Sequence, residues 1–312
     1  MTSFITKLFR KKTTRQTQST VQDLHPDIGP PSSDMSRISL AETSIPSPHI
    51  KSHIEVPQLI VGVGQSVGIQ RDHNEDSLFT LTTNLISGED SLYFGLYIIA
   101  DGMGGHENGE IASCLAVGQL TTHVINSFYL PIIRERGYKM ELSLQEVMHT
   151  GVIQAHQKIK QVALGGGTTL TAALILGNQM TIAHVGDSRA YMISPQGDIQ
   201  LLTHDHSLVK RLEEIGQISP EQASSHPQRN VLYRALGQGE PFAPDINTFQ
   251  MQPGSQLLLC TDGLWGVVPD NELVDVIRNA PEPQIACQSL IYSANSAGGP
   301  DNISVIIVRI PE

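Results

Sequence analysis

The chain has 312 residues, 39% of them hydrophobic, which is enough to bury the core of one large domain or two small ones. Its formal net charge is −11 and the acidic residues are dispersed, which argues against nucleic acid as a partner. Three cysteines stand singly and offer neither a disulfide framework nor zinc-ligand spacing, as is typical of a protein in a reducing cytoplasm: Cys114, Cys260 and Cys287.

Residues 1–55 are rich in Ser, Thr, Pro and Gln and lack a periodic apolar pattern. Such a segment cannot bury enough surface to offset the entropy of ordering, so we expect a disordered tail before a domain over residues 56–312. The start, MTSFITKLFRKK, does not have the pattern of a signal peptide. Its basic and apolar residues predict either a solvated basic end or a short amphipathic helix with weak affinity for a membrane surface.

From Leu59 onward, apolar runs of strand length are bounded by Gly, Asn or Pro. These runs predict strands over residues 58–64, 92–100, 169–176, 180–185, 189–194, 255–261 and 303–310. Tight turns at Gly177–Asn178 and near Gln196–Gly197 indicate antiparallel connections.

Helical spacing of apolar residues predicts two long helices, over residues 109–128 and 143–163, and two later ones over 270–279 and 283–296. Ser143 and Glu146 fit a capping box at the start of the second helix. Strands predominate and helices come in pairs, which predicts an α+β fold in which an antiparallel sandwich is covered by helices.

Acidic residues recur at the edges of the apolar runs. Two runs end in Asp-Gly, at Asp101 in LYIIADGMGG and at Asp262 in LLLCTDGLWG. Further acids beside predicted strands are Glu75 and Asp76 in GIQRDHNEDSLF, Asp187 in AHVGDSRAY and Asp301 in GGPDNISVIIV. Each one alone also fits a turn or a helix cap. If the strand ends meet, the carboxylates repel one another, and divalent cations with oxygen ligands would remove that cost. The glycine after each Asp would tolerate tight turn dihedrals and let the backbone come close.

Four other features need an interpretation. GGGTT at Gly165–Thr169 suggests a phosphate loop, but no P-loop Lys follows and a strand comes next, which favours a flexible turn. The HDH run at 204–206 fits either a pair of metal ligands or a structural role. Cys260, inside a predicted strand, is interpreted as core rather than as a nucleophile, and Trp265 as packing under the acidic cluster.

Seven motifs in order carry a family resemblance over about residues 57–310. They are RDHNEDS, ADGMGGHENGE, GGTTLTAAL, HVGDSRAY, the segment from LTHDHSLV to LYRALG, LLLCTDGLWGVV and GGPDNISVIIV. The sequence resembles the metal-dependent serine/threonine protein phosphatases of type 2C in their bacterial form. The resemblance implies an αββα sandwich of two antiparallel sheets with a helix pair outside each, and a binuclear Mn²⁺ or Mg²⁺ centre at one end.

The resemblance also assigns roles to the acids. Asp101 matches the residue that bridges both metals, and Gly102 matches the residue whose backbone carbonyl binds one of them. Asp262 and Asp301 match carboxylates of the other metal. Glu75 and Asp76 match acids that bind metal directly or through water, and Asp187 matches the residue that holds, with Asp262, a third and weaker metal in bacterial members.

The implied reaction is hydrolysis of phosphoserine and phosphothreonine in proteins by a hydroxide that bridges the metals, with Arg71 gripping the phosphate. Eukaryotic relatives place a histidine after the first Asp-Gly, where this chain has Met103; His106 either replaces it as general acid or only packs there. Residues 206–237 match the flap of bacterial members. A catalytically inactive scaffold and a regulator of a sigma-factor pathway are the alternative functions, although regulators of that kind often lack the flap.

The resemblance leads us to expect a cytoplasmic monomer that acts on phosphoproteins, among them a bacterial Ser/Thr kinase and its targets. The Thr-rich stretch TTRQTQST in the tail suggests a kinase site or a ligand for a phosphothreonine-binding partner.

Overall fold

Apolar side chains of the central strands point alternately into two different cores. In β3 (Asp90–Ala100), Ile98 packs toward the helices on one side, whereas Tyr97 and Ile99 pack between the sheets. In β11 (Gln256–Cys260), Leu258 and Leu259 divide in the same way. Both faces of these strands are buried, which is why the sequence shows continuous apolar runs there rather than alternation.

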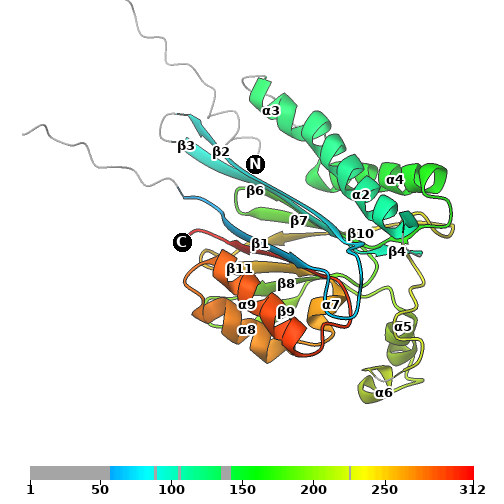
Figure 1. Ribbon diagram of the computed structural model, residues 1–312. Helices are drawn as coiled ribbons and strands as arrows, with labels where there is room; N and C mark the ends of the chain where they lie inside the picture. Colours follow the sequence, from blue (N-terminus) through cyan, green and yellow to red (C-terminus); the bar gives the residue numbers. More distant parts are fainter. Residues whose placement is uncertain (1–56, 88–89, 105–106, 135–141, 225) are drawn as a thin grey trace, which may run out of the picture. The chain divides into compact units, whose positions relative to one another are not determined.

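The computed structural model describes residues 57–312 except 88–89, 105–106, 135–141 and 225; the tail expected over residues 1–55 lies outside the described residues. The described residues form two five-stranded antiparallel sheets and a short two-stranded one (Figure 1). One large sheet has the spatial order β1 (Ile60–Ser66), β12 (Ile303–Arg309), β11, β8 (Arg189–Ile193), β9 (Ile199–Leu201). The other has the order β10 (Asp245–Gln250), β7 (Gln179–Val185), β6 (Leu170–Leu176), β3, β2 (Ser77–Ser87). The short sheet pairs β4 (Gly102–Met103) with β5 (Gly167–Thr168).

Helices cover the outer face of each sheet. The β3–β6 face is covered by α2 (Glu107–Val124) and α4 (Leu144–Val162), and α2 continues through a π-helical turn over Ile125–Tyr129 into α3 (Leu130–Arg134). The β11–β12 face is covered by α8 (Asp270–Asn279) and α9 (Pro283–Ser296). A third cluster of apolar side chains fills the space between the sheets. This is the predicted αββα sandwich, and Figure 1 shows its four layers.

The local predictions are largely confirmed. Ser143 accepts the backbone N–H of Glu146 at 3.2 Å, and the Glu146 carboxylate accepts the N–H of Ser143 at 2.7 Å, which is the predicted capping box. Gly177 turns the β6–β7 hairpin with φ of 56°. Strands β2 and β10 were not among the predicted strands; both lie at an edge of their sheet and are only partly buried. In the described part of the chain, no helix is both long and apolar enough to cross a membrane.

The flap extends from the sandwich beside α7 (Asp262–Trp265) and contains α5 (Leu208–Glu214) and α6 (Pro220–Ser224) (Figure 1). A short ladder closes its root: the N–H of Leu208 donates to the Val231 carbonyl at 2.8 Å, and the N–H of Tyr233 donates to the His206 carbonyl at 2.9 Å. The fold therefore places a loop-and-helix segment next to the edge where the acidic residues lie.

Candidate functional site

The acids gather at one edge of the sandwich because neighbouring strands run in opposite directions. The last residue of β3 pairs with the first of β2, which places Asp101 beside Asp76. The end of β7 pairs with the start of β6, which brings Asp187 to the same edge. Asp262 follows β11 and Asp301 precedes β12 in the second sheet. The site thus spans both sheets.

Burial and mutual repulsion dominate the electrostatics of this edge. Burial raises the pKa of Asp76 to about 7, with further contributions from Asp262 and Asp301. Burial also raises the pKa values of Asp101 and Asp187 well above the usual range, and neighbouring carboxylates add to both shifts. The pKa of Asp262 rises to about 6, from burial first and from Asp301 second. Without a cation, the charged form of this cluster is unfavourable.

The buried carboxylates keep unused oxygen atoms. Asp76 accepts hydrogen bonds from the Ser304 hydroxyl at 2.7 Å and the Thr261 hydroxyl at 3.1 Å, both on Oδ2. Among the described residues, neither Asp76 Oδ1 nor Asp262 Oδ1 has a hydrogen-bond partner, although both atoms are buried. Buried unpaired oxygens are costly, and an all-oxygen set suits a hard divalent cation. The residues therefore fit such an ion.

In the described residues, no three His, Cys, Asp or Glu side chains converge in the arrangement of a metal site. Both oxygens of Asp301 already accept hydrogen bonds. Arg71 donates to Asp301 Oδ2 at 2.7 Å, and the backbone N–H of Asn302 donates to Oδ1 at 2.8 Å. The Arg71 side chain is 49% exposed and Asp301 is 25% exposed, so this pair lies at the rim rather than the bottom of the site.

The GGGTT segment holds the backbone of Asp101. The backbone N–H of Thr169 donates to the Asp101 carbonyl at 2.9 Å, and the Thr168 hydroxyl donates to the same oxygen at 2.8 Å. In return, the N–H of Asp101 donates to the Thr169 hydroxyl at 2.9 Å. That hydroxyl also lies 2.8 Å from the hydroxyl of Ser188, next to Asp187. A turn at Leu164–Gly165 leads into β5, as the sequence predicted, whereas sequence reasoning missed the role of the two threonines.

The glycines of the two Asp-Gly pairs are explained by close backbone approach. A Cβ on Gly102 would lie 2.3 Å from the Gly109 carbonyl oxygen, and one on Gly263 would lie 2.0 Å from the Asn302 carbonyl oxygen. Neither glycine has a left-handed φ. The expectation of tight turn dihedrals is therefore wrong at both positions, whereas the expectation that the backbone comes close is confirmed.

Asn302 ties the loop that carries Glu75 to the second sheet. Its side-chain amide donates to the carbonyls of Val67 at 2.8 Å and His73 at 2.9 Å, and its Oδ1 accepts the N–H of Glu75 at 2.9 Å. The Glu75 carboxylate lies against Gly109 of α2, where a Cβ would approach Glu75 Oε2 to 2.3 Å. Asn302 is a further residue that sequence reasoning missed.

The HDH run has structural partners. Nδ1 of His206 accepts the N–H of Gly186 at 3.0 Å, and Nε2 lies 3.2 Å from Asp245 Oδ2 and 3.1 Å from Nη1 of Arg234. His204 contacts Glu214 in α5, and Asp205 pairs with Arg189. His106, the proposed general acid, lies outside the described residues, while Met103 lies in β4 and is partly buried.

A groove of about 640 Å³ separates the carboxylate edge from the flap. Its lining includes residues of the acidic cluster, of α7 and of the flap: Arg71, Asp187, Asp262, Asp301, Trp265, Lys210, Glu213 and Arg229. Trp265 lines this groove with Arg189 stacked on its ring, and it also packs against the apolar core that includes Leu264. A groove of this volume lies within the usual range of ligand-binding clefts.

A helix-covered double sheet with buried carboxylates at one edge and a flap across a groove defines the class of protein, and the comparisons agree. Residues 62–303 match the family model described as "Protein phosphatase 2C", and the chain belongs to this family.

Named relatives place the chain among bacterial serine/threonine phosphatases of this family. It is 37% identical to the serine/threonine phosphatase stp of Listeria welshimeri, over 77% of this chain and 91% of the relative. It is 36% identical to the protein phosphatase PhpP of Streptococcus pneumoniae, over 70% of this chain and 86% of the relative.

Solved structures agree with these relatives. The serine/threonine phosphatase of S. agalactiae has a TM-score of 0.69 at 32% identity, covering 81% of this chain and 99% of that one. The catalytic domain of the phosphatase PstP, solved in complex with two manganese ions, has a TM-score of 0.65 at 30% identity, covering 82% of this chain and all of that one.

Proposed function

We propose that this chain hydrolyses phosphoserine and phosphothreonine in proteins, with two Mn²⁺ or Mg²⁺ ions held at the carboxylate edge. The observation that carries the proposal is the set of buried carboxylates with raised pKa values and unused oxygens, which a divalent cation would compensate. Family membership and the two manganese ions of the PstP structure support it.

We assign the ligands as the resemblance suggests. Asp101 would contact both ions and the Gly102 carbonyl one of them, with Asp262 and Asp301 on the other. Glu75 and Asp76 would bind directly or through water, and Asp187, whose pKa Asp262 helps to raise, would hold a third ion with Asp262. When bound, the ions would lower the pKa of a water molecule and offset the charge of the phosphoryl group.

The protein's own contribution is to hold the substrate and the ligands in place. Arg71 lies at the rim with half of its side chain exposed, and its planar fork suits two hydrogen bonds to a phosphate. Asp301 orients it at 2.7 Å. Thr168 and Thr169 fix the backbone of Asp101, so its carboxylate needs little rearrangement.

We therefore expect Arg71→Ala to raise the KM for a phosphopeptide more than it weakens Mn²⁺ binding. Arg71→Lys keeps the charge but not the planar fork, so its KM should lie between those of wild type and Arg71→Ala. Titration calorimetry with Mn²⁺ separates the two effects, and weakened Mn²⁺ binding with an unchanged KM would exclude Arg71 as the phosphate ligand.

No side-chain nucleophile is required. Cys260 is fully buried in β11, and burial raises the pKa of its thiol far above its usual range. It is a core residue, as the sequence suggested. The inactive-scaffold alternative is not favoured, because each acid of the matched motifs is present. The complete flap speaks against a sigma-factor regulator.

The function is tested by release of inorganic phosphate from a phosphothreonine peptide. Activity should require Mn²⁺ or Mg²⁺ and disappear with a chelator. Asp101→Ala and Asp262→Ala should each lower turnover by orders of magnitude, because each removes a ligand rather than a tuning contact. Near wild-type turnover in either variant at limiting metal would contradict the two-metal assignment.

We extend the proposal to the cellular setting. The natural substrates would be a bacterial Ser/Thr kinase and its targets in the cytoplasm, met by the enzyme as a monomer. Residues 1–55 would act as an address, through the basic start at a membrane surface or through TTRQTQST as a ligand for a phosphothreonine-binding partner. Co-purification with and without residues 1–55 tests this extension.

A further inference from the structure

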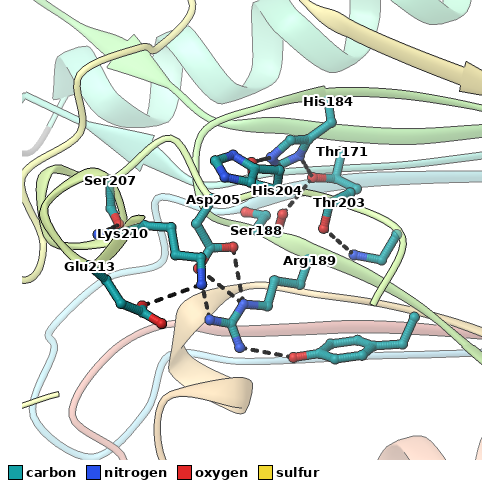
Figure 2. Close-up of polar contacts among 12 residues, drawn as sticks. Thr171, His184, Ser188, Arg189, Thr203, His204, Asp205, Ser207, Lys210 and Glu213 are labelled. Carbon is teal, nitrogen blue, oxygen red and sulfur yellow. Dashed lines mark hydrogen bonds and ion pairs between the residues drawn. The ribbon is translucent and has the colours of Figure 1, made fainter. Parts of the chain in front are cut away.

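Arg189, at the start of β8, contacts three other side chains with its guanidinium. Its guanidinium forms a forked ion pair with Asp205, in which Nη2 lies 2.7 Å from Oδ2 and Nε lies 3.1 Å from Oδ1 (Figure 2). Nη1 of Arg189 donates to the Tyr191 hydroxyl at 3.0 Å. The same group lies over the ring of Trp265, with Cζ 3.6 Å from the ring centroid. None of the roles assigned above uses this residue.

Asp205 lies at the root of the flap. The next residue, His206, donates its N–H to the Gly186 carbonyl at 2.7 Å, and Ser207 caps α5 by accepting the N–H of Lys210 at 3.3 Å. The flap ladder described above begins here. A group that fixes Asp205 therefore fixes the direction in which the flap leaves the sandwich.

The other contacts of Arg189 lie on the catalytic side. Arg189 follows Asp187 by two residues and pairs in register with Cys260, two residues before Asp262. Trp265 ends α7, the helix that begins at Asp262. One guanidinium thus joins the flap root to the two segments that carry Asp187 and Asp262, and both Arg189 and Asp205 line the groove.

We propose that Arg189 is a positioning residue that sets the flap wall of the groove relative to the carboxylate edge, and so determines how well a phosphopeptide, as opposed to a small phosphoester, is bound. A small phosphoester needs only the carboxylate edge, whereas a peptide also contacts the flap wall. This inference rests on the proposed phosphatase activity and adds a residue responsible for peptide selection.

The physical form of the contact supports positioning over simple stabilisation. The Asp205 side chain is 7% exposed and that of Arg189 is 22% exposed, and ion pairs this buried contribute little net stability relative to apolar groups of similar volume. The forked pair and the ring contact fix the orientation of Asp205 and Trp265 about the guanidinium, because both contacts are geometrically specific. Lysine at position 189 would keep the charge but lose the fork and the planar stacking on the ring.

The test compares a phosphothreonine peptide with p-nitrophenyl phosphate at saturating Mn²⁺. Wild-type activity on both substrates establishes the proposed function; without it, the proposed function fails and the variants are not informative. In Arg189→Met and Arg189→Lys, we expect kcat/KM for the peptide to fall by about tenfold or more, with little change for the phosphoester. Asp205→Asn should likewise lower the ratio of kcat/KM for the peptide to kcat/KM for the phosphoester. The effects of the Arg189 and Asp205 substitutions should not add, because both remove the same contact.

A double variant separates positioning from stability. Arg189→Met with Asp205→Leu replaces the pair by apolar groups and should recover most of any lost thermal stability while peptide selection stays impaired. Recovery of both would show that the pair only stabilises the fold. Lys160→Met serves as a control, because it breaks the Lys160–Glu240 pair outside the groove and should leave the ratio unchanged.

Trp265 is the only tryptophan of the chain, so its emission reports on this contact. Asp205→Asn should change the emission of Trp265, because Asp205 holds the guanidinium that covers the ring. An unchanged ratio of the two kcat/KM values in the single variants, including equal losses on both substrates, would overturn the proposal. Additive losses from the Arg189 and Asp205 substitutions would also overturn it.

Discussion

Asp101 is held by hydroxyl groups from a neighbouring strand rather than by charged partners. Its N–H and its carbonyl are both bound by Thr169, and Thr168 adds a second donor to the carbonyl. The Asp101 carboxylate shares a hydrogen bond with the carboxyl of Asp262, and burial raises the pKa of Asp101. A backbone held on both sides and a buried carboxylate beside another carboxylate suit a residue that receives a cation.

Thr169→Val tests this clamp. The change keeps the shape but leaves the Asp101 N–H and the Ser188 hydroxyl without this partner, at a cost of about 1–3 kcal/mol in the free energy of unfolding. We expect turnover to fall as well, because Asp101 loses its position. Thr181→Val is the matched control: it removes a buried hydroxyl pair with Thr248 away from the site, and it should lower stability without lowering turnover of the folded enzyme. Equal turnover in Thr169→Val and Thr181→Val would show that Thr169 does not hold Asp101 in position.

The raised pKa values predict a pH-dependent stability in the metal-free protein. A carboxyl whose pKa is higher in the folded state binds its proton more tightly there, so the stability it contributes is present below its unfolded pKa and is lost as pH rises through the folded value. For Asp262 this window extends from the ordinary value of 3.8 to about 6, and for Asp76 to about 7. His184, whose pKa burial lowers to about 4, has the opposite effect, so wild type must be compared with a variant.

Asp262→Asn should therefore be more stable than wild type in chelator at pH 8, with a smaller difference at pH 5. Thermal unfolding measures it. Adding Mn²⁺ at pH 8 should stabilise wild type more than the variant, because the variant lacks a ligand. A stability difference that does not grow with pH would show that the folded state does not disfavour the charged form of Asp262.

At the site, the sequence alone could indicate which acids gather but not how they are held. The acids stand out because each interrupts or borders an apolar run. Thr169 and Ser304 border the same strands, yet a hydroxyl at a strand end has too many ordinary uses to be singled out. The Arg71–Asp301 pair joins residues 230 positions apart, and no local pattern reports such a contact.

Among the elements, predictability follows burial. The central strands β3, β6 and β11 were predicted because both of their faces are apolar. Strand β2 contains Thr80, Thr82 and Thr83, and β10 contains Asp245 and Asn247, because an edge strand exposes much of its surface. Their apolar signal is too weak to separate them from loops. Helices α8 and α9 were predicted with their observed bounds, since Pro269 and Pro283 mark where each begins.

The capping box of α4 gives a prediction that should leave function untouched. Ser143→Ala removes the acceptor for the N–H of Glu146 and should lower the free energy of unfolding by about 1 kcal/mol. Glu146→Ala should not add its full effect, because the two side chains form one reciprocal motif. Chemical denaturation measures both variants. A loss of phosphatase activity per folded molecule would show that α4 does more than cover its sheet.

In the molecule as a whole, the site depends on both sheets. Asp76, Asp101 and Asp187 come from one sheet, whereas Asp262 and Asp301 come from the other. The apolar layer between the sheets, which includes Ile99 and Leu259, sets the distance between the two groups of acids. The sequence indicated this sandwich through its strand pattern and its motifs, but the packing of one sheet on the other is a property that no local pattern contains.

Removal of residues 1–55 tests whether the remaining chain is an independent domain. Because the tail has no core-forming pattern, turnover of p-nitrophenyl phosphate should be nearly unchanged and the unfolding transition should stay cooperative. An insoluble or unfolded product would show that these residues contribute to the fold. The full-length chain carrying Asp101→Ala is the control for background hydrolysis.

The central claim is that buried carboxylates from two sheets hold the cations that make this chain a protein phosphatase. The most direct measurement is phosphate release from a phosphothreonine peptide as Mn²⁺ is titrated into metal-free wild type and Asp262→Ala, with Mn²⁺ binding followed by calorimetry in the same samples. We predict that activity appears in wild type together with Mn²⁺ binding, and that Asp262→Ala loses both. Activity in wild type that persists without Mn²⁺ or Mg²⁺, or full activity in Asp262→Ala with unchanged Mn²⁺ binding, would contradict the account.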